Sequence, residues 1–324
     1  SVNLASEYRK RLDYGQPFAD VAYGNLRFHL SLPLGTNPNI NVSIRKHSMV
    51  SFSLSSVVEN PIRWQPILAR IVIERANFII CGGTGSGKTT TLYAALAQLN
   101  ASTTNILTVE DPIEYQMKRV NQTQVRPDIG LTFANGLRAL VRQDPDIIMV
   151  GEIRDLETAQ IAIQAAQTGH LVLSTLHTND APATLVRLRN MGVAPYNIAA
   201  SVSLITAQRL VRRLCPQCRV PTILSADTLR HAGLQTPNAT EYRVYTPQGC
   251  SACHKGFKGR TGIFQVMPMS AAMQDLLLQE VGSPLLERQA RLEGMRGLRE
   301  AGLHKVMAGE TSLEEVLSAT REQA

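Results

Sequence analysis

The stretch Gly82-Gly83-Thr84-Gly85-Ser86-Gly87-Lys88-Thr89 decides the fold, because it matches the P-loop pattern G-x-x-x-x-G-K-[ST] at every required position. An apolar run, Phe78–Cys81, precedes it, and a helical pattern from Thr90 to Leu99 follows. In that context, backbone N–H groups cradle phosphates at a helix N-terminus. We therefore expect the loop and Thr90 to bind a nucleoside triphosphate, with Lys88 on the β- and γ-phosphates and the Thr89 hydroxyl on Mg²⁺. The alternative is a glycine-rich turn that binds nothing.

The overall composition is that of an ordinary globular protein, with 44% hydrophobic and 18% charged residues. The 324 residues suffice for two domains or for one domain with appendages. Apolar runs such as Ile147–Val150 are too short to span a bilayer, and the N-terminal residues lack the pattern of a signal peptide. We therefore expect a cytoplasmic protein.

The formal net charge of +7 raises the question of nucleic acid or anionic lipid as a partner. The basic residues are dispersed, however, and their densest cluster is Arg209, Arg212 and Arg213. Aromatic residues make up 5% of the chain and do not alternate with basic ones, as a nucleic-acid stacking groove requires. The pattern predicts a solvated basic surface, weak attraction to acidic lipid and no specific nucleic acid.

Carboxylates follow two of the expected strands. The strand Asn105–Val109 runs into Glu110-Asp111-Pro112-Ile113-Glu114, and strand ends are where ligands bind in α/β folds. The apolar run Ile147–Val150 is followed by Gly151 and Glu152, a Walker B-like arrangement that would orient Mg²⁺-bound water. For the first segment, a solvated acidic turn remains the alternative.

Strands and helices alternate through the central region. Helices are expected from the N-cap Thr132 to Arg142, from Glu157 to Thr168, from Pro182 to Gly192 and from Pro195 towards Arg213. A buried strand has His170 at one end and His177 at the other. His177 would sense the γ-phosphate, although a lone histidine is more often structural. The alternation predicts an α/β fold with a parallel sheet and helices on both faces.

Two cysteine pairs, Cys215-Pro-Gln-Cys218 and Cys250-Ser-Ala-Cys253, have the spacing of a zinc ribbon. Each pair forms a turn that points two thiolates at one metal, and four thiolates leave no open position for substrate. The expected zinc is therefore structural. Disulfides are the alternative, and a reducing compartment disfavours them. The fifth cysteine, Cys81, is expected to be a small buried residue.

The remaining segments suggest four parts. Residues 1–60 are expected to be a partial, β-rich N-terminal domain with strands at Leu26–Leu34 and Val42–Arg45. Residues 61–210 would be the ATPase core and 211–260 the tetracysteine zinc module. Residues 261–324 would be a helical C-terminal region, with a strand at Ile263–Met267 and a capping box at Thr311–Glu314.

The chain resembles the secretion ATPase superfamily in the segments Gly82–Thr89, Ile106–Tyr115, Gln143–Asp155 and Thr168–Thr178. More narrowly, these segments are similar to the assembly ATPases of type II secretion and type IV pili. The segment Ala207–Cys215, the two cysteine pairs and the tail Gly309–Glu315 add to the match. The resemblance covers about residues 78–320.

This resemblance implies a RecA-like P-loop motor that hydrolyses ATP with Mg²⁺ and carries Zn²⁺ on the four cysteines. Glu114 would polarise the attacking water, Glu152 would be the Walker B acid, and His170 with His177 would form the family's histidine box. Such proteins form hexameric rings at the cytoplasmic face of the inner membrane. There they drive pilin or pseudopilin extrusion through a membrane platform protein.

Three departures from the family pattern affect these expectations. Gly83 stands where the family usually has proline, and the N-terminal region matches only the later part of the family's domain. In that domain, strand arginines reach the nucleotide. Arg45 aligns with one of them, but His29 stands where another is expected, and Arg27 is its nearest substitute.

The expected mechanism is phosphoryl transfer to water, with Lys88 neutralising charge on the phosphates and Glu114 orienting the nucleophile. Three rivals remain. A pilus retraction ATPase shares the acidic and histidine boxes, but the resembling retraction motors lack the cysteines. A nucleic-acid translocase would be stimulated by single-stranded DNA, and a non-hydrolysing scaffold would show no turnover.

Overall fold

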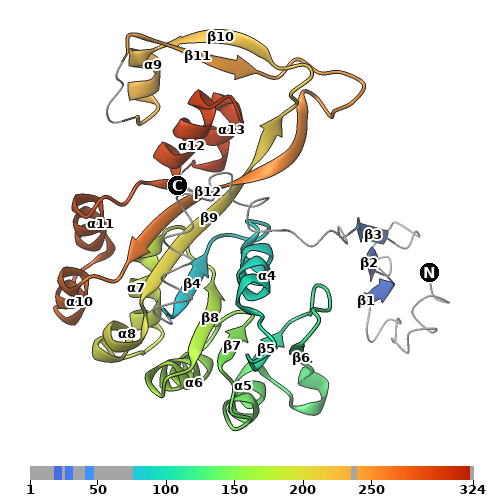
Figure 1. Ribbon diagram of the computed structural model, residues 1–324, viewed down its shortest axis with the longest axis vertical. Helices are drawn as coiled ribbons and strands as arrows, with labels where there is room; N and C mark the ends of the chain where they lie inside the picture. The colour runs from blue at the N-terminus through green and yellow to red at the C-terminus, as the bar shows by residue number, and fades with distance from the viewer. Residues whose placement is uncertain (1–17, 24–25, 32–40, 47–75, 235–238, 322–324) are drawn as a thin grey trace, which may run out of the picture. The chain divides into compact units, whose positions relative to one another are not determined.

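The computed structural model describes residues 18–23, 26–31, 41–46, 76–234 and 239–321 (Figure 1). The chain divides into two units, Ser1–Ser51 and Phe52–Ala324, which are considered separately. The boundary expected near residue 60 lies outside the described residues. Within the described part of the chain, no helix is both long enough and apolar enough to cross a bilayer.

The N-terminal unit contains a three-stranded antiparallel sheet in the order β1-β2-β3. Its strands are β1 (Phe18–Tyr23), β2 (Leu26–Ser31) and β3 (Asn41–Lys46). The alternating pattern of the second strand places Leu30 in the interior, where 1% of its surface is exposed. The two expected strands are therefore present, and β1 is an additional one.

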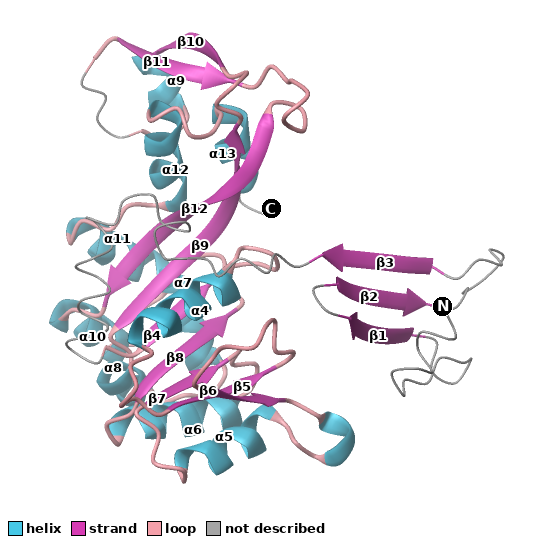
Figure 2. Ribbon diagram, turned by 45° about the vertical axis from the view of Figure 1, so that its right-hand side comes forward, coloured by secondary structure: helices cyan, strands magenta, loops and turns pink. Residues whose placement is uncertain are grey.

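The larger unit is built on a seven-stranded sheet in the order β12-β9-β4-β8-β7-β5-β6. Figure 2 shows the two long strands, β9 and β12, side by side. The seven strands are β4 (Phe78–Cys81), β5 (Ile106–Glu110), β6 (Val120–Gln124), β7 (Ile147–Val150), β8 (Leu171–Leu176), β9 (Leu204–Leu214) and β12 (Phe257–Pro268). Along this sheet order, every pair of adjacent strands from β9 to β6 is parallel, whereas β12 is antiparallel to β9. The sheet is thus mixed, which corrects the expectation of a purely parallel one.

Helices cover both faces of this sheet because its central strands are apolar on both sides. Phe78 and Ile80 belong to the cluster under α4 (Lys88–Leu99), whereas Ile79 and Cys81 belong to the cluster on the other face. That second face is covered by α5 (Phe133–Val141), α6 (Leu156–Gln167), α7 (Ala181–Asn190) and α8 (Pro195–Ser201). A short 3₁₀ helix, η1 (Pro127–Ile129), precedes α5.

Polar N-caps begin three of these helices. The side chains of Thr132, Asp155 and Asp180 accept hydrogen bonds from the backbone N–H three residues later. The cap expected at Thr132 is confirmed. The sequence pattern predicts helix starts at Glu157 and Pro182. The other two caps place both starts one residue earlier.

One helix prediction is wrong. The helix from Pro195 ends at Ser201, and residues 204–214 form strand β9 instead of continuing the helix towards Arg213. The segment Leu204-Ile205-Thr206-Ala207 is buried between β4 and β12, and its β-branched residues suit a strand with covered faces. Tertiary pairing therefore overrides the local helical periodicity.

The C-terminal part continues from the long strands β9 and β12. A second sheet of two strands, β10 (Val220–Ser225) and β11 (Glu241–Thr246), is accompanied by α9 (Ala226–His231). Four helices follow β12: α10 (Ala271–Leu278), α11 (Ser283–Leu292), α12 (Leu298–Met307) and α13 (Leu313–Ala319). The expected helical character of this region is confirmed, and a third apolar cluster joins α9, β11, α12 and α13.

Two details differ from the expectation for this region. The last helix is capped by Ser312, which accepts from the Glu315 N–H, while Thr311 donates to the Arg212 carbonyl oxygen at 2.8 Å. The strand expected at Ile263–Met267 is longer and runs from Phe257 to Pro268. Strands β9 and β12 run across residues 210 and 260, so the division there remains an interpretation of the sequence.

Candidate nucleotide site and metal centre

The carboxyl ends of four adjacent strands meet at one edge of the sheet. In spatial order these strands are β4, β8, β7 and β5, and all four run parallel. The P-loop follows β4, His177 follows β8, Glu152 lies two residues after β7, and the acidic segment begins at the end of β5. The topology therefore brings these four segments, which are distant in sequence, to the same edge.

The glycine loop has a backbone that other residues would not adopt. Gly82, Gly85 and Gly87 have φ values of 153°, 74° and 88°. A Cβ atom on Gly82 would lie 2.5 Å from the backbone oxygen of Gln208, and one on Gly87 would lie 2.9 Å from its Nε2 atom. Strand β9 therefore supports the loop from behind, while Gly83 has open space around it.

Lys88 opens helix α4 and folds back over the loop. Its Nζ atom donates to the carbonyl oxygens of Gly82 at 2.7 Å and Gly83 at 3.0 Å, and 8% of the residue is exposed. Burial lowers the pKa of Lys88 from its ordinary value of 10.5, against the opposing effects of Cys81 and Glu152. The amine is thus held over the loop, near the negative charge of Glu152.

The other loop residues divide into exposed and buried groups. Thr84, Gly85 and Thr89 are exposed, Gly83, Gly87 and Thr90 are half-buried, and Gly82 and Ser86 are buried. Exposure leaves the Thr89 hydroxyl accessible to a ligand. The Ser86 hydroxyl has no hydrogen-bond partner among the described residues, although its oxygen is buried.

The Glu152 carboxylate contacts two side chains, those of His177 and Arg154. Its Oε2 atom is 3.2 Å from Nε2 of His177, and its Oε1 atom pairs with the Arg154 guanidinium. The side chain of Glu152 is 14% exposed, whereas that of His177 is 50% exposed. Burial is the main cause that lowers the pKa of His177, and Lys88 lowers it further, whereas Glu152 raises it. Arg154 also approaches the Asp111 carboxylate at 3.7 Å.

The two glutamates of the acidic segment have different surroundings. Glu110 is 1% exposed, pairs with the Tyr93 hydroxyl and accepts from the Thr108 hydroxyl at 2.5 Å. Glu114 is half-buried and lies in the irregular segment between β5 and β6. Its backbone N–H donates to the Tyr93 hydroxyl at 3.2 Å. The structure therefore buries the Glu110 carboxylate and leaves Glu114 partly accessible.

The two histidines expected to act together lie at opposite ends of β8. His170 precedes the strand, and its Nδ1 atom lies 2.9 Å from the Ala165 carbonyl oxygen and 3.1 Å from the Thr168 hydroxyl. These contacts belong to the C-terminal turn of α6. Only His177 therefore stands at the edge that carries the P-loop.

The N-terminal arginines occupy paired positions in their own sheet. In the β2–β3 register, Arg27 lies opposite Arg45, and His29 lies opposite Ser43. The two arginines are thus neighbours across one strand pair, and whether Arg27 takes the role of the residue expected at position 29 stays a prediction.

The four cysteines of the two C-x-x-C pairs come together as the spacing predicts. All four Sγ atoms lie within 4.8 Å of one another. Cys215 is 3.9 Å from Cys250, and Cys253 is 3.6 Å from both Cys218 and Cys250. Tetrahedral zinc with bonds of about 2.3 Å holds its sulfurs about 3.8 Å apart, so this cluster fits zinc. All five cysteines are free, which is not the arrangement of a disulfide framework.

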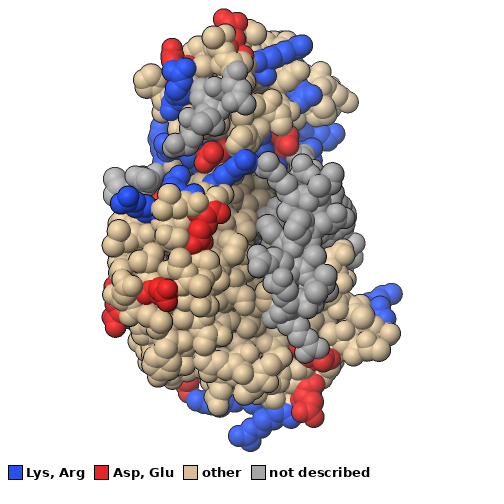
Figure 3. Space-filling model, turned by 60° about the vertical axis from the view of Figure 1, so that its left-hand side comes forward, with Lys and Arg blue, Asp and Glu red and all other residues tan. Residues whose placement is uncertain are grey.

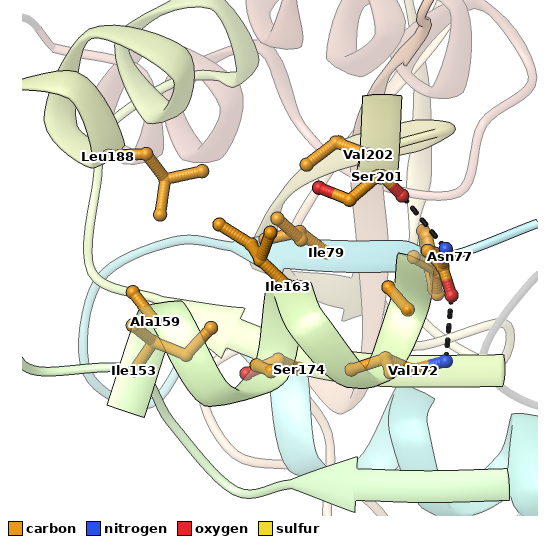
Figure 4. Close-up of a pocket in the computed structure, with 13 residues that line it drawn as sticks. Asn77, Ile79, Ile153, Ala159, Ile163, Val172, Ser174, Leu188, Ser201 and Val202 are labelled. Atoms are coloured by element: carbon orange, nitrogen blue, oxygen red, sulfur yellow. Dashed lines mark hydrogen bonds between the residues drawn. The ribbon is translucent and has the colours of Figure 1, made fainter. Parts of the chain in front are cut away.

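A separate cavity of about 30 Å³ lies on the face covered by α6 and α8 (Figure 4). Asn77 closes one side, donating to the Ser201 carbonyl oxygen and accepting from the Val172 N–H, both at 2.8 Å. The other lining side chains are aliphatic, aromatic or serine, and none of them titrates. The cavity therefore offers no general acid or base for hydrolytic chemistry.

Charged side chains on the face shown in Figure 3 form small groups of mixed sign, and a broad part of that face is uncharged. Several arginines among the described residues are also neutralised by ion pairs. Arg138 pairs with Glu157, Arg212 with Glu315 and Arg230 with Asp227. This arrangement agrees with the expectation of dispersed basic residues on a solvated surface.

Sequence reasoning missed two polar residues that support the site. Tyr93 is 1% exposed and contacts the acidic segment from α4, while Gln208 is fully buried behind the P-loop and accepts from the Thr91 hydroxyl at 2.8 Å. A signal existed for both. Tyr93 is an aromatic hydroxyl among small helix residues, and Gln208 follows a run of buried strand residues, so each needs a polar partner.

Comparison with known proteins decides the family. The model of the family described as "Type II/IV secretion system protein" matches residues 18–318. The chain belongs to this family. Among curated family relatives, it is 49% identical over 255 residues to the type IV pilus assembly ATPase PilB of Pseudomonas aeruginosa, covering 79% of this chain and 45% of that protein. It is 50% identical over 256 residues to the type II secretion system ATPase E of Vibrio cholerae, covering 78% of this chain and 50% of that protein.

The chain spans about half the length of the curated relatives it matches. Solved structures of similar fold include the pilus retraction motor PilT with bound ADP, with a TM-score of 0.66 and 23% identity, covering 100% of this chain and 82% of that one. The ATPase DotB of Legionella pneumophila has a TM-score of 0.63 and 21% identity, with coverage of 92% and 75%. At this identity the likeness concerns the fold, and it supports the α/β assignment.

Proposed function

We propose that this chain is the motor part of an ATPase that hydrolyses ATP to drive pilus or pseudopilus assembly, in type IV pilus biogenesis or type II secretion. One observation carries the proposal. The P-loop lysine, Glu152 and the segment bearing Glu114 lie at a single edge of the sheet. These are the parts that phosphoryl transfer to water requires. Over 79% and 78% of its length, the chain is 49% identical to a type IV pilus assembly ATPase and 50% identical to a type II secretion system ATPase.

In this proposal each residue is assigned a role that suits its position. The P-loop N–H groups and Lys88 bind the phosphates, and Lys88 exchanges its bonds to the Gly82 and Gly83 carbonyls for phosphate oxygens. Mg²⁺, when bound, neutralises charge on the β- and γ-phosphates. Thr89 and Glu152 would hold the metal or its water. Glu114 accepts a proton from the attacking water, and His177, paired with Glu152, contacts the γ-phosphate side.

The four cysteines would hold one structural zinc ion. The fit of their sulfur distances to tetrahedral coordination supports this assignment. The metal would tie the turn after β9 to the turn before β12, because Cys215 and Cys218 follow the first strand and Cys250 and Cys253 precede the second. No catalytic step involves it.

The working assembly in this proposal is a ring, most simply a hexamer, at the cytoplasmic face of the inner membrane, where it acts on a membrane platform protein. Arg45, aided by Arg27, supplies positive charge to the nucleotide of a neighbouring subunit. The division into an N-terminal domain, ATPase core, zinc module and C-terminal helices belongs to the same proposal. Its support is the separate N-terminal unit and the family membership.

A deletion strain tests the proposal in the cell. The strain is scored for surface pili and for secreted proteins, and is complemented with the intact gene or with the gene carrying Lys88→Ala. Rescue by the intact gene alone is expected. Loss of fibre retraction with normal assembly would instead identify a retraction motor.

Purified protein provides the biochemical test. Mg²⁺-ATP turnover is expected in the wild type and absent from Lys88→Ala, with the same far-UV circular dichroism spectrum for both. Near-wild-type turnover in Lys88→Ala would refute the mechanism. Strong stimulation by single-stranded DNA would favour a nucleic-acid translocase.

A further inference from the structure

The segment that carries Glu114 has no regular secondary structure of its own. Between the end of β5 at Glu110 and the start of β6 at Val120, residues 111–119 form bends, a turn and irregular backbone. A general base must be held within hydrogen-bond reach of the water that it deprotonates. Since neither a helix nor a strand holds this segment, side chains from neighbouring elements must do so.

Tyr93 contacts this segment from the P-loop helix. Its hydroxyl accepts from the backbone N–H of Glu114 at 3.2 Å and from Nε2 of Gln122 at 3.3 Å, and it donates to the Glu110 carboxylate. One hydroxyl offers one donor and two acceptor positions. The donor serves Glu110, and one acceptor position serves the Glu114 N–H. The other takes part of the two hydrogens that Gln122 Nε2 shares among Tyr93, Glu110 and the Tyr115 carbonyl oxygen. The hydroxyl therefore fixes the backbone of Glu114 relative to the helix that begins with Lys88.

Glu110 sets the direction of these bonds. Its carboxylate is buried and accepts from Tyr93, from Thr108 at 2.5 Å and from Gln122 at 3.1 Å. A carboxylate only accepts, so the Tyr93 proton must point towards Glu110 and the oxygen lone pairs must face Glu114 and Gln122. The buried Glu110 carboxylate thus orients the Tyr93 hydroxyl so that its oxygen can accept from the Glu114 N–H.

Two glutamines on β6 hold the segment from the other side. Gln124 accepts from the Ile113 N–H at 2.9 Å, and Gln122 accepts from the Met117 N–H at 2.7 Å while donating to the Tyr115 carbonyl oxygen at 3.1 Å. The Tyr115 ring also packs edge-on against Tyr93, with centroids 4.6 Å apart. Glu114 lies in the middle of this bonded segment.

We propose that Tyr93 is a positioning residue for Glu114, and that its hydroxyl holds the base at a constant distance from the P-loop helix. The inference rests on the proposed ATPase function, which it deepens by naming what orients the base. Helix α4 carries both Lys88, at its first position, and Tyr93, five residues later. A shift of that helix when phosphate binds would therefore move the base together with the lysine.

The test substitution is Tyr93→Phe, which removes the hydroxyl and keeps the ring. We expect kcat for Mg²⁺-ATP to fall by about 10²-fold, since a displacement of about 1 Å at a reacting group has that effect. KM for ATP should stay within about twofold, because the P-loop contacts are unchanged. Hydrogen exchange at the Glu114 amide should become faster, a result that does not depend on activity.

The matched control is Tyr115→Phe. Among the described residues, the Tyr115 hydroxyl makes no hydrogen bond, and the ring and backbone contacts survive the substitution. Kinetic constants and Glu114 amide exchange should therefore remain at wild-type values. A loss equal to that of Tyr93→Phe would show that any change near the segment has the same effect, and would overturn the proposal.

A double variant separates positioning from stability. Tyr93→Phe leaves the Glu110 carboxylate without one donor, and adding Glu110→Gln removes that buried charge. The melting temperature should rise towards the wild-type value while kcat stays low, because neither change restores an acceptor for the Glu114 N–H. All variants are assayed at a temperature at which they bind nucleotide.

Three outcomes would contradict the proposal, and they are distinct from failure of the proposed function. Unchanged Glu114 amide exchange in Tyr93→Phe, unchanged kcat in Tyr93→Phe, or recovery of kcat together with stability in the double variant would each overturn it. Wild-type turnover that Lys88→Ala abolishes supports the ATPase function, whatever Tyr93→Phe does. Absence of wild-type turnover refutes that function.

Discussion

The Nε2 atom of His177 lies 3.2 Å from the Oε2 atom of Glu152, so the strand-end histidine is a direct partner of the Walker B-like carboxylate. Lys88 lies close enough to affect the same imidazole electrostatically. The histidine thus contacts a carboxylate and feels the positive charge of Lys88, and its protonation reports on both.

This arrangement predicts a lowered pKa for His177. Burial is the main cause and Lys88 the next, so an NMR titration of the ring should give a midpoint below the ordinary value of 6.5. In Lys88→Ala the midpoint should rise, because a nearby positive charge has gone. An unchanged midpoint in that variant would contradict the electrostatic effect of Lys88 on His177.

The same shift predicts a pH dependence of stability. A histidine whose folded-state pKa is lowered takes up a proton more readily when unfolded. Stability should therefore fall as the pH drops through 6.5 towards the lowered value, and should be unaffected by this group above 6.5. Urea unfolding between pH 5 and 8 should show a flatter dependence in His177→Gln. Equal slopes in both proteins would refute the assignment.

The two glutamates of the acidic segment should respond differently to amidation. Glu114→Gln should retain ATP binding and the melting temperature but slow turnover by about 10²-fold or more, because it removes the general base. Glu110→Gln should chiefly destabilise the fold, because an amide replaces a buried carboxylate that accepts three hydrogen bonds. We expect a lower melting temperature and a free energy of unfolding reduced by about 1–3 kcal/mol. If a well-folded Glu110→Gln protein turns over more slowly than Glu114→Gln, the roles are reversed.

The cysteine cluster predicts a structural metal. Purified protein should contain about one zinc ion per chain, in line with one four-thiolate site. Cys215→Ser and Cys253→Ser should lose it and lower the melting temperature, since metal binding contributes folding free energy. Cys81→Ala is the control, because Cys81 is buried outside the cluster and should leave the zinc content unchanged. Disulfides within either C-x-x-C pair in protein kept anaerobic would contradict the prediction.

If Arg45 supplies charge to the nucleotide of a neighbouring subunit, ATPase activity should depend on assembly. Specific activity should rise with protein concentration, and a non-hydrolysable ATP analogue should promote a ring detectable by light scattering. Arg45→Ala should lower kcat by about 10³-fold and change ATP affinity little, because the charge acts mainly on the transition state. Lys46→Ala removes an equal charge one residue further along β3 and is the control. A monomer of constant specific activity at every dilution would refute the idea.

The sequence by itself determined the parts whose chemistry is local. The P-loop, its preceding strand and its helix follow from the glycine spacing and the apolar run before it, since a glycine backbone and a buried strand need no distant information. The two C-x-x-C pairs likewise predicted that four sulfurs would meet. Thr132 predicted a helix start because its side chain bonds three residues ahead.

Only the tertiary structure decided which residues become neighbours. Residues 204–214 form a strand because β4 and β12 lie on either side of them, which their own periodicity did not indicate. Glu110 and Glu114 look alike in the sequence, but Tyr93 and the neighbouring strands bury the first and leave the second partly accessible. His170 and His177 look like a pair, yet a strand carries them to opposite ends. Burial and strand length depend on the whole packed sheet, which no local pattern contains.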